Sequence, residues 1–119
     1  MDRGTASSLR QKLHDLRLER DRLEEELLEI RAFVRGSLVA HHTLSGGRRR
    51  THPAFYLFRW EGGKRRSHYI RRDHLERARR EVNAYRRYRQ GVLRLRSLGQ
   101  EILEVFQSLS ECQEVPPPL

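Results

Sequence analysis

The first third of the chain carries leucines at the spacing of a coiled coil. Apolar side chains recur every three, four or seven residues, at Leu9, Leu13, Leu16, Leu23, Leu27, Ile30 and Val34. This spacing places them on one narrow face of a helix. The sequence therefore predicts a helix over residues 7–35, capped by Ser7 or Ser8 and ended at Gly36, after a frayed segment of residues 1–6. Its apolar face needs a partner helix.

A second helical pattern fills residues 73–110. Apolar residues recur three or four positions apart throughout, and Asp73 with Glu76 has the spacing of a capping box. Prolines at the end of the chain prevent the helix from continuing, so residues 111–119 are expected to form a flexible tail. Gly91 and Gly99 indicate either slack or positions where another helix approaches closely.

Between the two helices the pattern changes to that of β-strands. Two β-favouring runs flank Gly62-Gly63, and a Gly-Gly pair can adopt the positive φ angles of a two-residue hairpin turn. Counting outward from this turn pairs Glu61 with Lys64, Trp60 with Arg65, Phe58 with Ser67, and Tyr56 with Tyr69. Residues 37–43 predict a further strand that would complete a three-stranded meander, and residues 44–53 predict a flexible basic loop.

The predicted fold class is therefore α+β and mostly α. Two long helices form an antiparallel coiled-coil hairpin, with a small antiparallel β-hairpin or three-stranded meander inserted at its tip. We expect one elongated domain over residues 7–110, in which residues 37–70 form the basic β segment between the helices.

The two faces of the hairpin mix aromatic rings with arginines. Period-two alternation places Tyr56, Phe58, Trp60, Arg65, Ser67 and Tyr69 on one face, and Phe55, Leu57, Arg59, Arg66, His68 and Ile70 on the other. Interleaved rings and guanidinium groups are typical of surfaces that bind nucleic acid. Alternatively, Phe55, Leu57 and Ile70 pack on helices while the arginines only keep the rim soluble.

The positive charge is concentrated in the middle of the chain. The formal net charge is +9, and residues 48–96 hold 17 Arg and Lys against 4 Asp and Glu. Such a local excess favours polyanions. The residues predicted to contact nucleic acid are Arg48, Arg49, Arg50, Arg59, Trp60, Lys64, Arg65, Arg66, His68, Arg71, Arg72, Arg79, Arg80, Arg86 and Arg87.

Signals for catalysis, metal and membrane are weak. The single Cys112 excludes an internal disulfide, and His41, His42 and His52 lack the fourth ligand of a structural zinc site. We find no nucleophile–base arrangement and no phosphate-binding glycine loop, so we expect no catalysis, no cofactor and no bound metal. No apolar run has the length of a membrane span and no secretion signal opens the chain, so we expect a cytoplasmic protein without a membrane partner.

A family resemblance covers residues 35–103. The matching features are Arg35-Gly36-Ser37-Leu38-Val39, the hairpin with Tyr56-Leu57 and Gly62-Gly63-Lys64, and the helical segment Tyr85-Arg86-Arg87-Tyr88-Arg89. These resemble a family of small bacterial and archaeal proteins of unknown function, often found beside or within mobile elements. That family usually carries a cysteine cluster between the first strand and the aromatic strand. The corresponding stretch here, residues 41–52, has no cysteine, so the resemblance implies architecture rather than a zinc site.

Three functional interpretations remain open at this point. The first is a nucleic-acid-binding accessory protein, with duplex DNA favoured and structured RNA possible. The second is a coiled-coil interaction subunit that forms a homodimer or docks on a larger enzyme, with the charge serving solubility. The third, and the least favoured, is a protein that binds membrane surfaces.

Overall fold

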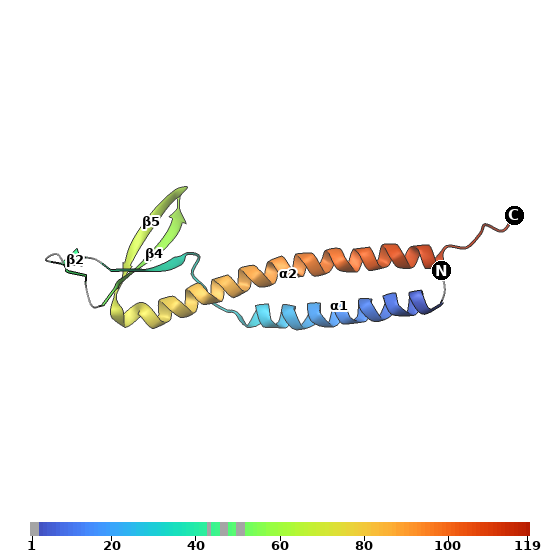
Figure 1. Cartoon of the computed structure of the whole chain (residues 1–119), viewed down its shortest axis with the longest axis horizontal. Helices are drawn as coiled ribbons and strands as arrows, with labels where there is room; N and C mark the ends of the chain where they lie inside the picture. Colours follow the sequence, from blue (N-terminus) through green and yellow to red (C-terminus); the bar gives the residue numbers. More distant parts are fainter. Residues whose placement is uncertain (1–2, 43, 46–47, 50–51) are drawn as a thin grey trace. The chain divides into compact units, whose positions relative to one another are not determined.

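The computed structural model describes residues 3–42, 44–45, 48–49 and 52–119. In chain order it contains α1 (Arg3–Glu29), β1 (Ser37–His41), β2 (Leu44–Ser45), β3 (Arg48–Arg49), β4 (Ala54–Glu61), β5 (Lys64–Ile70), the 3-10 turn η1 (Arg72–His74) and α2 (Leu75–Gln113) (Figure 1). The predicted α+β class, with two long helices and a three-stranded antiparallel sheet between them in the chain, is confirmed.

The contacts within the chain divide it into two compact units. Residues up to Glu29 together with Gln90–Leu119 form one, which we call the helical unit. Ile30–Arg89 form the other, which we call the sheet unit. The continuous helix α2 contributes its first turns to the sheet unit and the remainder to the helical unit.

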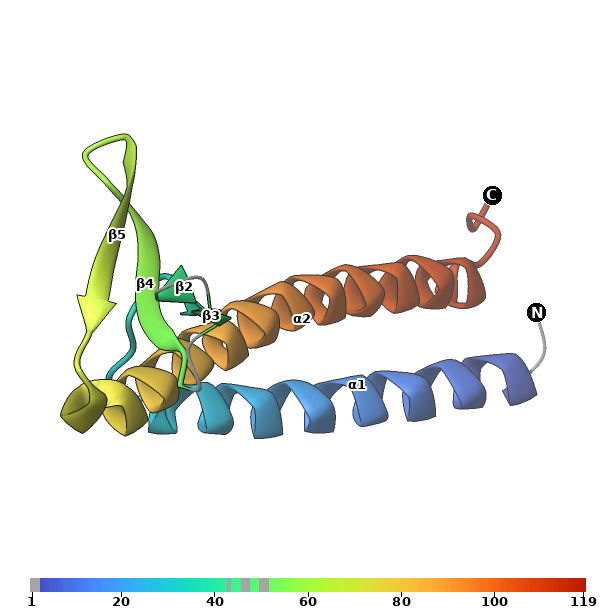
Figure 2. The same ribbon diagram turned by 60° about the vertical axis from the view of Figure 1, so that its left-hand side comes forward.

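The helical unit buries the two predicted apolar seams against each other. α1 and the later turns of α2 lie side by side and run in opposite directions (Figures 1 and 2). The buried cluster consists of Leu16, Leu98, Ile102, Val105 and Leu109, with Leu9, Leu13 and Leu23 packed against it. Leu98 at its centre has no exposed surface. The three-and-four spacing of the sequence thus reports the contact face of each helix.

The two glycines of α2, Gly91 and Gly99, have different surroundings. A Cβ atom at Gly91 would lie 2.5 Å from Cδ2 of Leu27, so this glycine marks a close approach of α1. A Cβ atom at Gly99 would meet nothing within 4 Å among the described residues. The close approach predicted as one alternative therefore occurs at Gly91, whereas no other described element comes close to Gly99.

One ion-paired cluster lies beside the apolar seam. Arg94 donates hydrogen bonds to both carboxylate oxygens of Glu19, at 2.8 and 3.0 Å, and a third to Glu101 at 3.3 Å. The hydrogen bond from Arg94 lowers the pKa of Glu19 below its usual value, and the same contact raises the pKa of Arg94. A basic residue of α2 is thus paired with an acidic residue of α1.

The predicted start of α1 is wrong by four residues. The helix begins at Arg3, so residues 3–6 are helical rather than frayed, and Ser7 and Ser8 lie inside the helix instead of capping it. The apolar periodicity begins only at Leu9. A helix begins where its backbone hydrogen bonds begin, which the apolar pattern does not report.

The predicted end of α1 is also wrong, by six residues. The helix stops at Glu29, because the following residues contact the first turns of α2 instead of continuing the helix. The backbone N–H of Val34 donates to the carbonyl oxygen of Glu81 at 3.1 Å. The ring of Phe33 packs on the rings of Tyr85 and Tyr88, with centroids 5.4 and 5.2 Å apart. Tertiary contacts here override local helix propensity.

The bounds of α2 and its expected cap need correction as well. Asp73 does not cap the helix, because it lies inside η1, where its carboxylate is 3.6 Å from Nε of Arg71. The chain leaves extended geometry at Arg71, and His74 N–H donates to the Arg71 carbonyl at 2.9 Å. At the other end the helix continues to Gln113, three residues beyond the predicted limit, so the first residues of the expected tail are helical.

The central sheet confirms the predicted meander. Its strand order is β1-β4-β5, and both neighbouring pairs are antiparallel. All four predicted pairs across the hairpin are present, including Trp60 with Arg65 and Tyr56 with Tyr69. Gly62 and Gly63 have φ angles of 56° and 80°, the left-handed geometry that a tight hairpin turn of this kind requires. Figure 2 shows this turn directed away from the first turns of α2.

The predicted loop over residues 44–53 is interrupted by a second, very short sheet. β2 and β3 pair with each other, Leu44 with Arg49 and Ser45 with Arg48. Two short runs on either side of a Gly-Gly sequence favour a hairpin, and the same reasoning that identified the β4–β5 turn applies here. The loop interpretation was therefore wrong for these four residues.

One face of the central sheet packs on α2. Leu57 is buried, and Val34, Leu57, Ile70, Ala78 and Val82 surround an apolar hollow of ≈ 300 Å³. Phe55 lies 5.1 Å beneath the guanidinium of Arg79 from α2. These contacts agree with the interpretation that Phe55, Leu57 and Ile70 pack on a helix. The opposite face leaves Trp60 and Tyr69 exposed by 71% and 61%.

Candidate nucleic-acid interface

A cleft opens in the sheet unit where β1 begins. Ser37, the first residue of β1, pairs with Phe58, whereas β4 continues for three more residues to Glu61. The last part of β4 therefore has a strand on one side only. The resulting cleft has a volume of ≈ 610 Å³, within the range of about 300–1,000 Å³ that is usual for ligand sites.

Gly36 lines the cleft and lets the chain pass close to β4. A Cβ atom at this position would lie 2.8 Å from both Cδ1 of Leu57 and the carbonyl oxygen of Phe58. Only glycine allows the chain to pass so close to β4 without displacing its backbone. Gly36 was expected to end a helix in left-handed geometry, but its φ is not positive. Its role is close packing.

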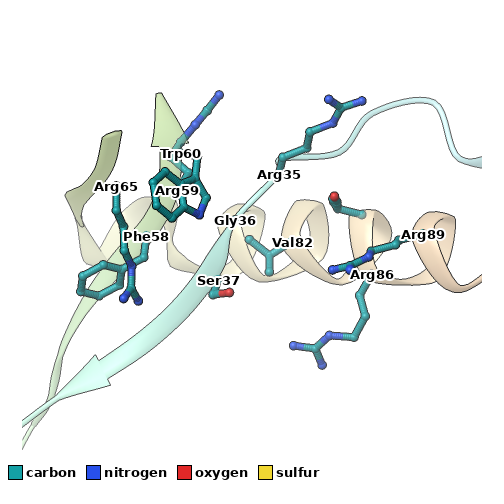
Figure 3. A pocket seen from close by; sticks show the side chains of 11 residues that line it. Arg35, Gly36, Ser37, Phe58, Arg59, Trp60, Arg65, Val82, Arg86 and Arg89 are labelled. Carbon is teal, nitrogen blue, oxygen red and sulfur yellow. The ribbon is translucent and has the colours of Figure 1, made fainter. Parts of the chain in front are cut away.

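The two walls of the cleft come from the hairpin and from α2. Figure 3 shows Phe58, Trp60 and Arg65 on one side and Arg86 and Arg89 on the other, with the start of β1 between them. The α2 wall follows from helical spacing, because residues three, four and seven positions after the buried Val82 lie on the same face of the helix. Sequence positions far apart in the chain thus meet at one site.

Positive charge dominates the cleft. Among the residues that the structure describes, its lining includes Arg35, Arg59, Arg65, Arg86 and Arg89 and no Asp or Glu. Nε of Arg59 lies 3.4 Å from Glu61 and makes no hydrogen bond. Within the described part of the chain, the other four guanidinium groups have no carboxylate within 4.0 Å. Guanidinium groups in this state retain their donors for an anionic ligand.

The aromatic rings of the cleft are not equally available. Arg65 lies 4.8 Å from the ring centroid of Phe58. Tyr85 contacts Phe33 and lies 6.0 Å from the guanidinium of Arg35. Trp60 has no ring or cation partner among the described residues, and it is mostly exposed. It is therefore the one ring lining the cleft whose face is free.

The structure separates the predicted contact residues into groups. Four of them, Arg59, Trp60, Arg65 and Arg86, line the cleft. On the other face of the hairpin, Glu61 hydrogen-bonds the ring of His68 at 2.7 Å and lies 4.0 Å from Nε of Arg66, so both side chains have an acidic neighbour. Lys64 follows the turn and is exposed.

The other predicted residues whose side chains are described do not line the cleft. Arg71 pairs with Asp73, and Arg79 lies 3.5 Å from Glu76. Arg72, Arg80 and Arg87 are exposed. The backbones of Arg48 and Arg49 form β3, and Arg50 lies outside the described residues.

The sequence analysis missed three members of the cleft. Arg89 could have been found, because it follows Arg86 by three residues and the buried Val82 by seven. Tyr85 was assigned to packing, which its contacts with Phe33 support, but it also lines the cleft. Arg35 could not be assigned to the cleft from the sequence, because its position depends on the strand that begins at Ser37 and pairs with β4.

The histidines do not form a metal-binding cluster. In the described ranges, no group of three or more His, Cys, Asp or Glu side chains could hold a metal ion. His41 instead contacts the ring of Tyr56 edge-on, with centroids 5.9 Å apart. No described helix is both long enough and apolar enough to cross a membrane.

The fold and the cleft define a class of small α+β protein with a helical hairpin and a basic antiparallel sheet. The chain belongs to the family described as a domain of unknown function, DUF6788, which matches residues 13–80. This match includes the hairpin wall of the cleft but ends before Arg86 and Arg89. Comparison with curated proteins and with solved structures finds no match.

Proposed function

We propose that this protein binds nucleic acid through the cleft of the sheet unit. The observation that carries the proposal is the set of five arginines around one cleft with no carboxylate in its lining. The sheet unit as a whole has 17 Arg and Lys against 4 Asp and Glu, a net charge of +13. The positively charged side chains of this unit repel one another, and binding of a phosphate backbone would relieve that repulsion.

The biological setting that we propose follows from the sequence resemblance. A small basic protein related to those encoded near mobile elements would act as an accessory factor for the nucleic acid of such an element, in the cytoplasm. The cleft supports binding rather than catalysis, because its polar groups are five guanidinium groups, the Ser37 and Tyr85 hydroxyls and the Trp60 indole N–H, with no His, Asp or Glu among the described lining residues to act as a general base.

Paired arginine variants test this function. Arg86→Ala with Arg89→Ala removes two guanidinium groups from the cleft, whereas Arg80→Ala with Arg87→Ala removes two exposed ones from the same helix outside it. Both double variants have the same net charge and keep good helix formers. We expect the cleft variant to weaken binding of mixed-sequence oligonucleotides and to lower the salt dependence by about 0.9 per lost phosphate contact on duplex DNA.

The matched pair makes the outcome decisive. Equal loss of affinity in both double variants would assign binding to overall charge and would overturn the cleft as the interface. A parent protein that fails to bind either DNA or RNA at low salt would overturn the function itself. Circular dichroism should show unchanged helix content in both variants.

A second candidate function, self-association through α2, has an observation of its own. Val92, Leu103 and Phe106 are exposed and lie on one side of α2, adjacent to the buried seam. In the same part of the helix, Arg94 and Arg96 precede Gly99, and Glu101, Glu104 and Glu111 follow it. A second copy running antiparallel would place arginines beside glutamates and cover this apolar stripe. We therefore propose a second copy of this chain as its occupant.

Sedimentation velocity at micromolar concentration tests self-association. We expect a dimer for the parent and a monomer for Leu103→Glu with Phe106→Glu. Leu18→Glu, at an exposed position on α1, is the control and should leave the dimer intact. A monomeric parent with full helicity, or equal dissociation by both variants, would overturn the proposal.

A further inference from the structure

Trp60 is the feature of the cleft that backbone phosphate binding does not explain. A large apolar ring that remains 71% exposed does not contribute to a core. Its cross-strand partner is Arg65, whose guanidinium is directed onto Phe58 instead of onto the indole. The face of the indole is therefore left open at the rim of a cleft whose opposite wall is cationic.

Stacking chemistry limits what can occupy such a face. In a regular duplex, each base is covered on both sides by its neighbours, so an indole cannot reach a base face without disrupting the helix. An unpaired base has a free face, and stacking it on an aromatic side chain is worth about 1–3 kcal/mol. The arrangement of one free ring opposite arginines matches the platforms that bind single strands.

We infer that the cleft binds an unpaired nucleotide of a DNA or RNA strand, with its base stacked on Trp60 and its phosphates facing Arg86 and Arg89. This inference rests on the proposed function and narrows its ligand. The sequence analysis favoured duplex DNA, but charge alone does not distinguish paired from unpaired strands. The exposed indole favours an unpaired strand, because only an unpaired base has a face free to stack on it. Arg86 and Arg89 come from the helix, so the phosphate contacts and the stacking contact can be removed separately.

The chain offers a direct spectroscopic probe, because Trp60 is its only tryptophan. We expect a single strand, or a duplex with one unpaired nucleotide, to quench the fluorescence of the parent protein. A fully paired duplex of the same sequence should bind with much less quenching. DNA and RNA versions of each ligand distinguish the two sources of the unpaired base.

Two ring variants sharpen the test. Trp60→Leu should weaken binding of the unpaired ligands by about 5- to 150-fold, the loss of one stacked base, with little effect on duplex affinity or on the salt slope. Tyr69→Leu is the matched control, because Tyr69 is also an exposed ring of the hairpin but does not line the cleft. It should leave affinity for both ligand classes unchanged.

Failure of this inference can be told apart from failure of the proposed function. If Trp60→Leu and Tyr69→Leu bind unpaired ligands equally well, or if duplex quenches as strongly as single strand, the unpaired-nucleotide site is overturned. The Arg86 and Arg89 variant would still report on phosphate binding by the cleft. Thermal melting of both ring variants shows whether a loss of affinity arises from unfolding of the hairpin, which would also overturn the stacking role.

Discussion

The helical unit and the sheet unit place their charged side chains in different environments. In the helical unit, 12 Asp and Glu outnumber 8 Arg and Lys, and Arg94 is engaged with Glu19 and Glu101. In the sheet unit, 17 basic residues face 4 acidic ones, and four cleft arginines have no carboxylate partner among the described residues. Paired charges in the first unit can contribute to folding, whereas an unpaired excess costs stability, and the proposed ligand would relieve that cost.

Apolar side chains show the same contrast. The helical unit buries a continuous seam around Leu98, and the sheet unit has a smaller core in which Leu57, Val82 and Ala84 are buried. Meanwhile its largest ring, that of Trp60, stays exposed. On the proposed function, the larger buried core lies in one unit and the binding cleft in the other, and the following experiments test this separation.

The largest expected effect is loss of stability without loss of binding. Leu98→Ala should lower the free energy of unfolding by about 2–5 kcal/mol, the usual cost of truncating a fully buried leucine. Folded Leu98→Ala protein should bind oligonucleotides with parental affinity, because the cleft belongs to the other unit. Urea denaturation followed by circular dichroism measures the first quantity and fluorescence anisotropy the second. Leu28→Ala, at a position 79% exposed, is the control and should change stability by less than about 0.5 kcal/mol. Reduced affinity of folded Leu98→Ala protein would contradict the separation.

Periodicity and turn chemistry account for what the sequence predicts well. The helices follow from apolar spacing, and the hairpin register follows from Gly62-Gly63 together with alternation along β4 and β5. Both signals are local. The C-terminal end of α1 was wrong for the opposite reason, because Phe33 and Val34, which follow the helix, make contacts with residues about fifty positions later.

The cleft could be predicted only in part. Arg59, Trp60, Arg65 and Arg86 were among the residues named from composition and alternation, but nothing local showed that they share a site. Their meeting depends on the pairing of Ser37 with Phe58, which fixes where β1 leaves β4. Arg66 and His68 stay predicted contacts, but Glu61 on the same face of the hairpin hydrogen-bonds His68 and lies 4.0 Å from Arg66, which a count of positive charges does not take into account. The period-two alternation of the strands already places Glu61 on the same face as Arg66 and His68.

The second prediction compares one closely packed glycine from each unit. Gly36→Ala should destabilise the protein by about 1–3 kcal/mol, because its Cβ would press on the backbone carbonyl of Phe58, which cannot move alone. Gly91→Ala should be close to neutral, since the clash is with the flexible end of Leu27 and alanine gains about 1 kcal/mol in a helix. Thermal melting of both variants measures the difference. Equal melting temperatures would show that β1 tolerates displacement from β4.

The third prediction separates two neighbouring arginines of the hairpin. Arg65→Ala should weaken oligonucleotide binding by on the order of 1.5 kcal/mol, the size of one hydrogen bond to a charged group. Arg66→Ala should have a smaller effect, because Arg66 lies on the opposite face near Glu61. The two variants have equal charge, so salt-resolved anisotropy compares them directly. A larger effect of Arg66→Ala would move the interface to the other face of the sheet.

The smallest expected effect concerns the ion pair of the helical unit. Glu19→Gln should lower the stability slightly at neutral pH, because Arg94 hydrogen-bonds the Glu19 carboxylate in the folded state and lowers its pKa. A carboxylate whose pKa is lowered by folding stabilises the folded state above its unfolded pKa, and this contribution is lost as the pH falls through the lowered folded value. The difference between parent and variant should therefore be present at neutral pH and vanish in strongly acidic solution. Glu25→Gln, which removes an exposed and unpaired carboxylate from α1, is the charge-matched control. A difference that persists in acid, or one equalled by Glu25→Gln, would show that helix packing and not the Arg94 pair sets the effect, because exposed pairs contribute little and are screened by salt.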